Sequence, residues 1–153
     1  MKSWFGALVA LVALAAFDGR PARAQAGDIT GIWLTEDGEG SVEITACGQM
    51  RCGRIVWIRQ AAGAASPLLD ARNPDPALRT RPLCHLQVLR NLSRQSDGRW
   101  GGGEVYDPDE GKTWSVIVAR DGDALRVTGY LGNPLLGETQ RWTRAPPGRT
   151  SCR

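Results

Sequence analysis

The sequence has little of what common active sites are built from. His85 is the only histidine, so a histidine-based zinc site would be short of ligands. No Gly-x-Ser-x-Gly motif, phosphate-binding loop or Cys-x-x-Cys pair is present. No run of basic residues follows the first 24 residues, which gives no case for nucleic acid as a partner. These absences leave no metal or cofactor to predict and make catalysis the least supported function.

One long apolar run does occur, at the start of the chain. Lys2 precedes residues 4–17, which are uncharged and almost wholly apolar. This length is typical of a signal-peptide core and too short to cross about 30 Å of hydrocarbon, with a short membrane anchor as the alternative. The small-x-small sequence Ala22-Arg23-Ala24 predicts cleavage before Gln25, with a cut after Ala26 as a second choice.

Removal of residues 1–24 as a signal peptide leaves residues 25–153, enough for one β-rich domain and too few for two. Lys2, Arg20 and Arg23 against Asp18 give the removed segment +2 of the formal net charge of +3. No later stretch is long and apolar enough to span a membrane. In a bacterium we therefore expect a nearly neutral mature chain in the periplasm or secreted, not spanning the membrane.

Four cysteines lie in the mature chain, and an even number indicates disulfides in an exported protein. Cys47 and Cys52 lie between two strand-like runs, where a four-residue turn would place them opposite each other on a hairpin. By elimination, Cys84 would pair with Cys152 and tie down the C-terminal tail. We expect both bonds to be structural.

Strand-like segments recur along the mature chain, whereas helix signals are nearly absent. They cover residues 31–35, 41–46, 52–59, 83–92, 99–106, 112–120, 124–131 and 137–144. Most connections are short, which favours antiparallel neighbours. The pattern predicts an all-β fold, an eight-stranded antiparallel up-and-down barrel, with a two-sheet sandwich as the alternative. Such a barrel is either filled by side chains or holds one small ligand.

One connection, residues 60–82, is long, and we call it the flap. Its second half is rich in proline and in charges of both signs. Long loops in compact domains are usually functional or disordered. We expect an ordered flap over one barrel end, with a short helical turn from Pro76 to Arg79 capped by Asp75.

Seven side chains are candidates for ligand binding: Asn73, Asp75, Arg79 and Arg81 on the flap, and Glu104, Tyr106 and Tyr130 on strands. The flap arginines suit an anionic ligand, although the flap charges can instead pair with one another and hold the flap shut. By alternation, Trp100, Gly102, Glu104 and Tyr106 share one strand face. If that face is internal, Glu104 is a buried carboxylate that an arginine or Tyr130 could partner. If it is external, Glu104 is solvated.

Two further features have structural interpretations. Residues 107–111, Asp-Pro-Asp-Glu-Gly, resemble part of a calcium loop but lack its full spacing, so a β-turn is predicted. His85 follows Cys84 on a predicted strand, which would place the two side chains on opposite faces. We therefore expect a packed or surface histidine rather than a cysteine–histidine pair.

Short motifs are spread over nearly the whole mature chain. They are Gly31-Ile32-Trp33-Leu34-Thr35, Cys47-Gly48, Cys52-Gly53-Arg54-Ile55-Val56-Trp57, Asn73-Pro74-Asp75-Pro76, Arg81-Pro82-Leu83, Tyr106-Asp107-Pro108, Gly111-Lys112-Thr113, Gly129-Tyr130-Leu131-Gly132 and Trp142-Thr143-Arg144. By these motifs the chain resembles the bacterial family known as domain of unknown function 2147. The resemblance implies a small exported protein without an established activity. Cys84 departs from the family pattern, which has a small or aliphatic residue there.

Gly-x-Trp on the first predicted strand, with arginine on the last, is also similar to the lipocalins and their barrel relatives. The resemblance implies that Trp33 closes one barrel end and that Arg141 or Arg144 lies over its ring. Such a contact contributes about 0.5–2 kcal/mol and is structural. The similarity supports a barrel. It gives only weak support for ligand binding, because fold alone does not fix function.

The leading hypothesis is a periplasmic barrel that binds a small apolar or amphipathic molecule in its lumen without catalysis. The alternative is an envelope protein–protein interaction module, with the lumen filled by bulky side chains. An enzyme that uses Glu104, Tyr106 or Asp75 is the third and least supported hypothesis, because no acid–base or nucleophile pair can be identified from residue spacing.

Overall fold

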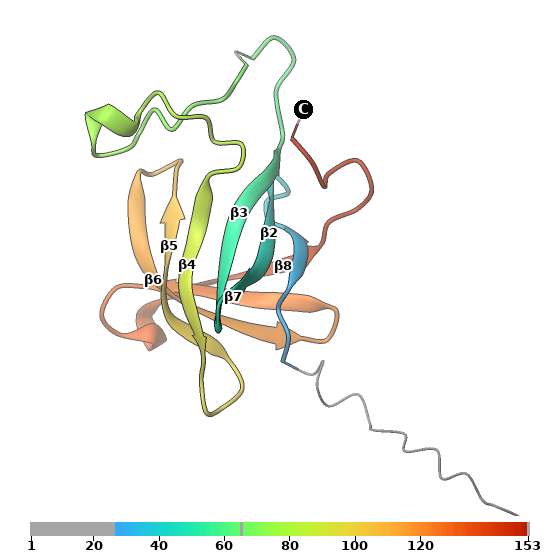
Figure 1. Ribbon diagram of the computed structural model, residues 1–153, viewed down its shortest axis with the longest axis vertical. Helices are drawn as coiled ribbons and strands as arrows, with labels where there is room; N and C mark the ends of the chain where they lie inside the picture. The colour runs from blue at the N-terminus through green and yellow to red at the C-terminus, as the bar shows by residue number, and fades with distance from the viewer. Residues whose placement is uncertain (1–26, 65, 153) are drawn as a thin grey trace, which may run out of the picture.

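The computed structural model describes residues 27–64 and 66–152, and its main feature is a β-barrel (Figure 1). The strands are β1 Gly31–Leu34, β2 Gly40–Cys47, β3 Met50–Ile58, β4 Gln87–Arg94, β5 Trp100–Asp107, β6 Lys112–Asp121, β7 Ala124–Tyr130 and β8 Glu138–Arg144. The predicted signal peptide, residues 1–24, lies outside the described residues. Within them, no helix is long and apolar enough to cross a membrane.

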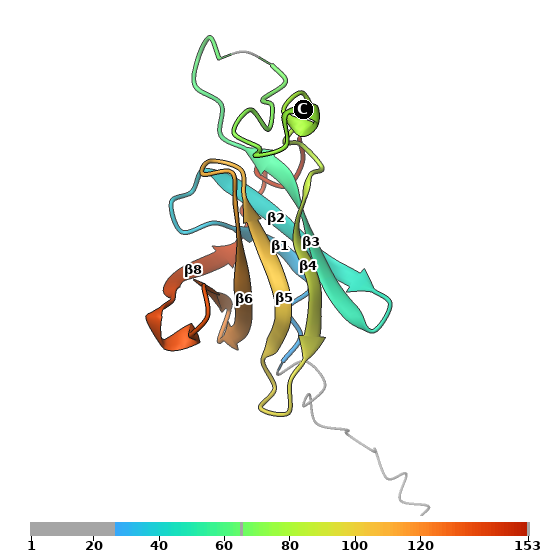
Figure 2. The same ribbon diagram turned by 90° about the vertical axis from the view of Figure 1, so that its left-hand side faces the viewer.

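Each strand pairs antiparallel with its neighbours in the sequence, and β1 also pairs with β8, so the sheet closes on itself (Figure 2). Closure satisfies the backbone N–H and C=O groups that an open sheet leaves unpaired at its edges. The predicted all-β, eight-stranded antiparallel up-and-down barrel is confirmed, and the chain does not form a two-sheet sandwich.

The core lies inside the barrel and follows the period-two pattern most clearly in β6, β7 and β8. Val118 pairs with Val127, and Leu125 pairs with Trp142, and all four side chains are buried. β-branched and aromatic residues fit this pleated, enclosed surface well. These strands consequently agree with their predicted boundaries to within one residue.

Alternation fails in β5, which contains three consecutive glycines. Gly102 has a φ of +72°, and the β5–β6 register shifts between Trp100 and Gly103. A Cβ on Gly103 would overlap the carbonyl of Arg90 on β4, so this close approach requires glycine. Trp100 is therefore buried while Glu104 is exposed, and the single face predicted for Trp100, Gly102, Glu104 and Tyr106 is wrong.

The fourth predicted strand begins too early. β4 starts at Gln87, and residues 83–86 form a turn in which His85 has a φ of +65°. The His85 backbone N–H donates to the carbonyl of Ile55 on β3 at 2.8 Å. This turn places the imidazole of His85 and the sulfur atoms of Cys84 and Cys152 within 4.8 Å of one another. The opposite faces predicted for Cys84 and His85 are therefore wrong, although His85 is exposed.

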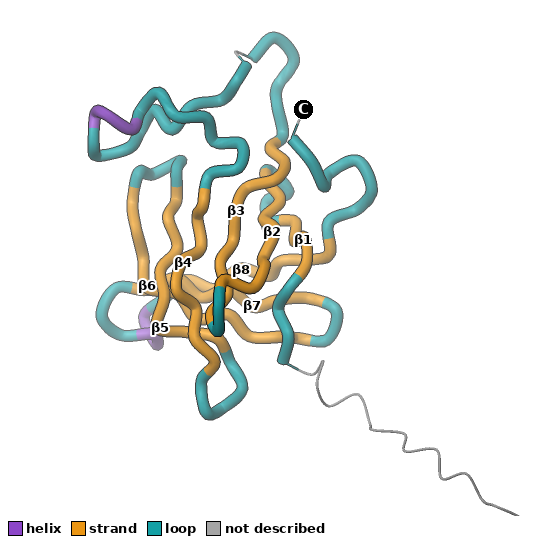
Figure 3. The backbone as a smooth tube through the Cα atoms, viewed as in Figure 1, coloured by secondary structure: helices purple, strands orange, loops and turns teal. Residues whose placement is uncertain are grey.

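Both expected disulfides are present, Cys47–Cys52 with Cα atoms 5.9 Å apart and Cys84–Cys152 with Cα atoms 6.1 Å apart. The turn between β2 and β3 was predicted to contain the four residues between Cys47 and Cys52. It contains only two, because Cys47 pairs with Met50. The first disulfide therefore joins diagonal positions of the hairpin, since Cys52 lies opposite Thr45. The second attaches the C-terminal tail beside the flap (Figure 3).

We expect the long-range disulfide to contribute more stability than the hairpin disulfide. The chain-entropy model gives about 4 kcal/mol for the bond that joins residues 68 positions apart and about 2 kcal/mol for the bond that joins residues 5 apart. Urea unfolding of C84S/C152S and of C47S/C52S, each against the unchanged protein, measures the two losses. Equal losses would contradict the entropic account.

Candidate functional site

The two ends of the barrel differ. The connections β1–β2, β3–β4, β5–β6 and β7–β8 lie at one end, which we call the mouth. The flap belongs to the β3–β4 connection and stands above the strand ends (Figures 1 and 2). The other end, reached by the hairpin turns β2–β3, β4–β5 and β6–β7 and by residues 27–30, is called the closed end.

Two tryptophans and several arginines seal the closed end. The indole N–H of Trp33, fully buried, donates to the carbonyl of Ile29 at 2.9 Å. The guanidinium carbon of Arg144 lies 3.9 Å from the Trp33 ring centroid, and that of Arg120 lies 5.0 Å from it. Burial and the neighbouring charge of Arg120 lower the pKa of Arg144 below its usual value. These contacts confirm the predicted role of Trp33 with Arg144.

Arg141, the other arginine predicted over Trp33, points elsewhere. Its guanidinium forms an exposed ion pair with Asp121 at 2.9 Å. Trp100 is the second aromatic of the closed end: its indole N–H donates to the carbonyl of Gly27 at 2.7 Å, and Arg51 lies over its ring at 4.4 Å. Side chains therefore fill this half of the lumen.

The half of the barrel next to the mouth is hollow. A cavity of about 460 Å³ extends from the mouth into the lumen. Its inner walls are apolar and come from most of the strands: Val42, Ile55, Val88, Val105, Trp114, Val127 and Trp142. Gly129 widens the cavity opposite Trp114 and Val105, where a Cβ would make ordinary contact only. Clefts of about 300–1,000 Å³ with mostly apolar walls are typical of small-molecule sites.

Carboxylates surround the opening of this cavity. The acidic lining residues are Asp37, Glu39, Asp107, Asp109, Glu110 and Glu138. Lysine, arginine and histidine are missing from the described residues that line it. Burial raises the pKa of Asp109 above its usual range, and the nearby negative charge of Asp107 raises it further, while Arg72 opposes the shift. The lining of the mouth is therefore acidic above an apolar lumen, with basic partners only outside the lining.

The turn at residues 107–111 holds part of this rim in place. The Asp107 carboxylate accepts hydrogen bonds from the backbone N–H groups of Asp109 and Glu110, at 2.8 Å and 3.3 Å. The backbone N–H of Gly111 donates to the Asp107 carbonyl at 2.8 Å. The segment is a tight turn closed by an i to i+4 hydrogen bond, one residue longer than the predicted β-turn, and the Asp107 carboxylate shapes its backbone.

A buried polar cluster fastens the flap to the barrel. Asp70, fully buried, accepts the Tyr106 hydroxyl at 2.6 Å and the Asn73 amide at 2.8 Å. Arg81 completes the cluster with an ion pair to Asp70 at 2.8 Å. Burial raises the pKa of Tyr106 above its ordinary value, and its bond to Asp70 acts in the same direction. All members satisfy one another, so the cluster is an anchor and not an open binding site.

The candidate binding residues are thus divided among different places. Tyr106 and Tyr130 line the mouth, as a ligand-binding role would require. Glu104 lies on the outer wall of the barrel, with its carboxylate 3.4 Å from the guanidinium of Arg90. Of the two faces considered for Glu104, internal and external, it occupies the external one. The remaining four, on the flap, shape the flap itself: Asn73, Asp75, Arg79 and Arg81.

The flap charges are engaged within the flap, but the predicted pairing of Asp75, Arg79 and Arg81 with one another is wrong. Asp75 caps η2, Pro76–Leu78, by accepting from the N–H of Ala77 at 2.9 Å. Arg79 donates to the carbonyl of Asn73 at 2.8 Å. Asp75 and Arg79 therefore bind backbone groups, whereas Arg81 pairs with Asp70, a flap carboxylate that was not among the predicted residues.

Sequence reasoning missed two residues. Asp70 lies in the featureless first half of the flap, where no pattern distinguishes it from a solvated loop aspartate. Trp114, by contrast, shares the alternating face of Val116 and Val118, a signal that could have placed it inside the barrel.

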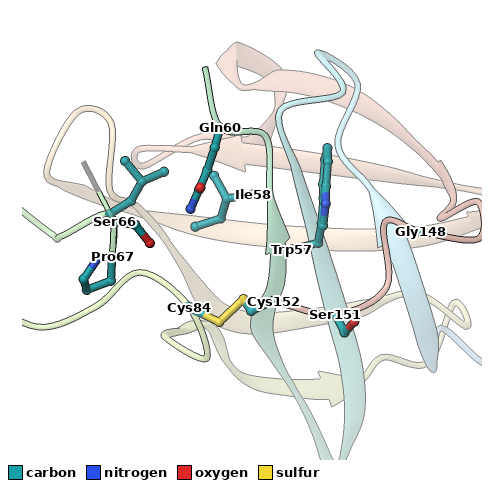
Figure 4. Close-up of a pocket in the computed structure, with 10 residues that line it drawn as sticks. Trp57, Ile58, Gln60, Ser66, Pro67, Cys84, Gly148, Ser151 and Cys152 are labelled. Atoms are coloured by element: carbon teal, nitrogen blue, oxygen red, sulfur yellow. A yellow bond between two sulfur atoms is a disulfide. The ribbon is translucent and has the colours of Figure 1, made fainter. Parts of the chain in front are cut away.

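A second cavity, of about 340 Å³, lies at the surface beside the Cys84–Cys152 disulfide (Figure 4). In Figure 4, Pro67 lies on one side of the disulfide, and Trp57 lies on the other together with Gly148 and Ser151 of the C-terminal tail. It is smaller than the lumen cavity and lies among loops, so the lumen is the stronger candidate.

A closed eight-stranded barrel, with a tryptophan and arginine at one end and a hollow lumen at the other, defines the class of lipocalin-like proteins. The family model described as "Uncharacterized protein conserved in bacteria (DUF2147)" matches residues 31–144, and the chain belongs to this family. A search of curated proteins gives no match.

Among solved structures, the chain is similar to one titled "Protein HP1028 from the human pathogen Helicobacter pylori belongs to the lipocalin family". The TM-score is 0.66 and the sequence identity 25%, over 78% of this chain and 84% of that one. This likeness agrees with the lipocalin-like fold.

We expect Tyr106→Phe to destabilise the protein by about 1.5–3 kcal/mol at pH 8, because Asp70 loses a charge-assisted hydrogen bond. The phenol pKa is raised from 10.0 on folding, so this stabilisation is present below pH 10 and is lost as the pH rises through the folded-state pKa. Urea unfolding at pH 8 and at higher pH should show the difference between the proteins shrinking. Tyr130→Phe, outside the cluster, serves as the control, and a pH-independent difference would contradict the anchor.

Proposed function

We propose that this protein is an exported, non-catalytic binding protein that holds one small apolar or amphipathic molecule in its lumen. The observation that supports this most directly is the cavity of about 460 Å³, walled by apolar side chains and open at the mouth. A void of this size in an otherwise well-packed core forgoes dispersion contacts that a ligand would restore. Burial of an apolar ligand would contribute roughly 25 cal/mol for each Å² removed from water.

Export is part of the same proposal. The signal-like residues 1–24 and the two disulfides support an oxidising compartment, the periplasm or the medium. In such a compartment a barrel with a sheltered lumen would carry a molecule that is poorly soluble in water.

A second function, contact with another envelope protein, is favoured by one observation. The β7–β8 connection exposes Leu131, Leu135 and Leu136, with 66%, 91% and 84% of their surfaces accessible. Large apolar side chains gathered on one loop are typical of interaction sites. Leu131 and Leu136 also line the cavity, so the two functions share one rim.

Lumen binding can be tested by filling the cavity from within. Gly129→Leu places a side chain between Trp114 and Val105 without backbone strain, and we expect it to reduce binding of the neutral fluorophore N-phenyl-1-naphthylamine at least about tenfold. Thr139→Leu introduces the same side chain at an exposed position on β8 that does not line the cavity, and should leave binding unchanged. Fluorescence titration measures both. Equal binding by the two variants would mean that the dye binds elsewhere.

A further inference from the structure

We propose that the molecule held in the lumen is a cationic amphiphile: an apolar body with a protonated amine or quaternary ammonium group that lies among the carboxylates of the mouth. The inference rests on the proposed function and specifies its ligand. It follows from the acidic lining of the mouth, from the carboxylates that are left without partners, and from the aromatic side chains beside them.

The charged side chains that line the cavity are all acidic. The whole chain has 19 lysines and arginines against 16 aspartates and glutamates, so an acidic mouth is not a result of composition. Arginines gather instead at the closed end, over Trp33 and Trp100: Arg51, Arg94, Arg120 and Arg144. A ligand entering the mouth therefore meets six carboxylates while the lining offers it no positive side chain. Such a field favours a cation and repels an anion.

Four of the six carboxylates already have partners. Glu39 pairs with Arg59 at 3.2 Å, and Glu110 pairs with Lys112 at 3.1 Å. Asp37 and Asp107 accept hydrogen bonds within their own turns.

Asp109 and Glu138 remain. Within the described residues, no hydrogen bond or ion pair engages either carboxylate. These two groups belong to the β5–β6 turn and to β8, and both line the cavity. They are therefore the acceptors that a ligand's positive group would meet.

The environment of Asp109 supports the same conclusion. Its pKa is raised by burial and by the negative charges of Asp107, Asp37 and Glu39, and Arg72 compensates only in part. The charged form of a carboxylate that lies close to other negative charges is stabilised more by a bound cation than the charged form of an isolated carboxylate is. Arg72 is itself engaged, because its guanidinium donates to the Asp109 carbonyl.

Aromatic side chains lie on the path between the carboxylates and the apolar wall. Tyr106, Tyr130 and Trp114 all line the cavity. Lys112 lies 5.8 Å from the Trp114 ring centroid and Arg81 lies 5.8 Å from that of Tyr106, so Tyr130 is the ring without such a contact among the described residues. Aromatic faces beside carboxylates are a recurrent means of binding ammonium groups.

The test compares ligands that share a tail and differ in the head group. N-phenyl-1-naphthylamine bound to the lumen is displaced, at neutral pH and low salt, by decyltrimethylammonium, decanol or decanoate, each below its aggregation concentration. We expect the cation to compete at least about tenfold better than the anion, with decanol between them, and the difference to shrink at high salt.

A matched pair of variants assigns the preference to the mouth. D109N/E138Q removes the two free carboxylates and should lower the affinity for decyltrimethylammonium about five- to tenfold while leaving that for decanol unchanged. D123N/E104Q makes the same change of charge outside the lumen and should leave both affinities unchanged. Retained binding of decanol shows that either variant is folded.

The outcomes separate the two proposals. If the dye does not bind, or binds equally to the lumen-filled Gly129→Leu variant, the proposed lumen function fails. If the dye binds in the lumen but decanoate competes as well as the cation, the carrier stands and the cationic ligand is overturned. An equal effect of D123N/E104Q would also overturn it, because the preference would then follow net charge.

Discussion

The barrel depends on the pairing of its first and last strands. β1 and β8 meet through Trp33 opposite Arg144 and Leu34 opposite Thr143, the shortest register in the sheet. A side-chain contact reinforces this short seam, because the Arg144 guanidinium lies over the buried Trp33 ring and donates to the carbonyl of Thr30 at 3.1 Å. Closure turns a strongly twisted sheet into an enclosed volume. Without the seam there would be no lumen, no closed end and no mouth.

Within that volume the protein is packed at one end and hollow at the other. The closed end uses tryptophans, whose size fills the lumen, and arginines, whose charge is dispersed over the rings. The mouth end uses valine, isoleucine and glycine walls, which leave space, and the flap covers part of the rim through the Asp70–Tyr106 anchor. The tryptophan–arginine contacts and the cavity thus lie in separate parts of one barrel.

Much of the fold could be predicted from local patterns. The alternation of apolar and polar residues located the strands, and turn residues located their ends. The predicted export of the chain favoured disulfide bonds between the cysteines. The errors occurred where non-local contacts override local preference. β5 changes face at Gly102 because the Gly103 backbone must approach Arg90, and the segment before β4 is a turn because the His85 N–H bonds to β3. The role of Asp70 depended on a phenol 36 residues away in the chain, which no spacing rule identifies.

The sequence by itself determined the fold class and the disulfide partners, because these follow from short-range periodicity and from the number and spacing of the cysteines. It identified Trp33 but left its arginine open between Arg141 and Arg144. Only the tertiary structure decided that the lumen is half empty, that Glu104 faces outward and that the flap charges serve as an anchor. The mouth is likewise a tertiary feature, since its carboxylates come from turns and strands far apart in the chain: Asp37, Glu39, Asp107, Asp109, Glu110 and Glu138. Only the closed barrel brings these carboxylates together. The overall composition of the chain is slightly basic and does not indicate an acidic mouth.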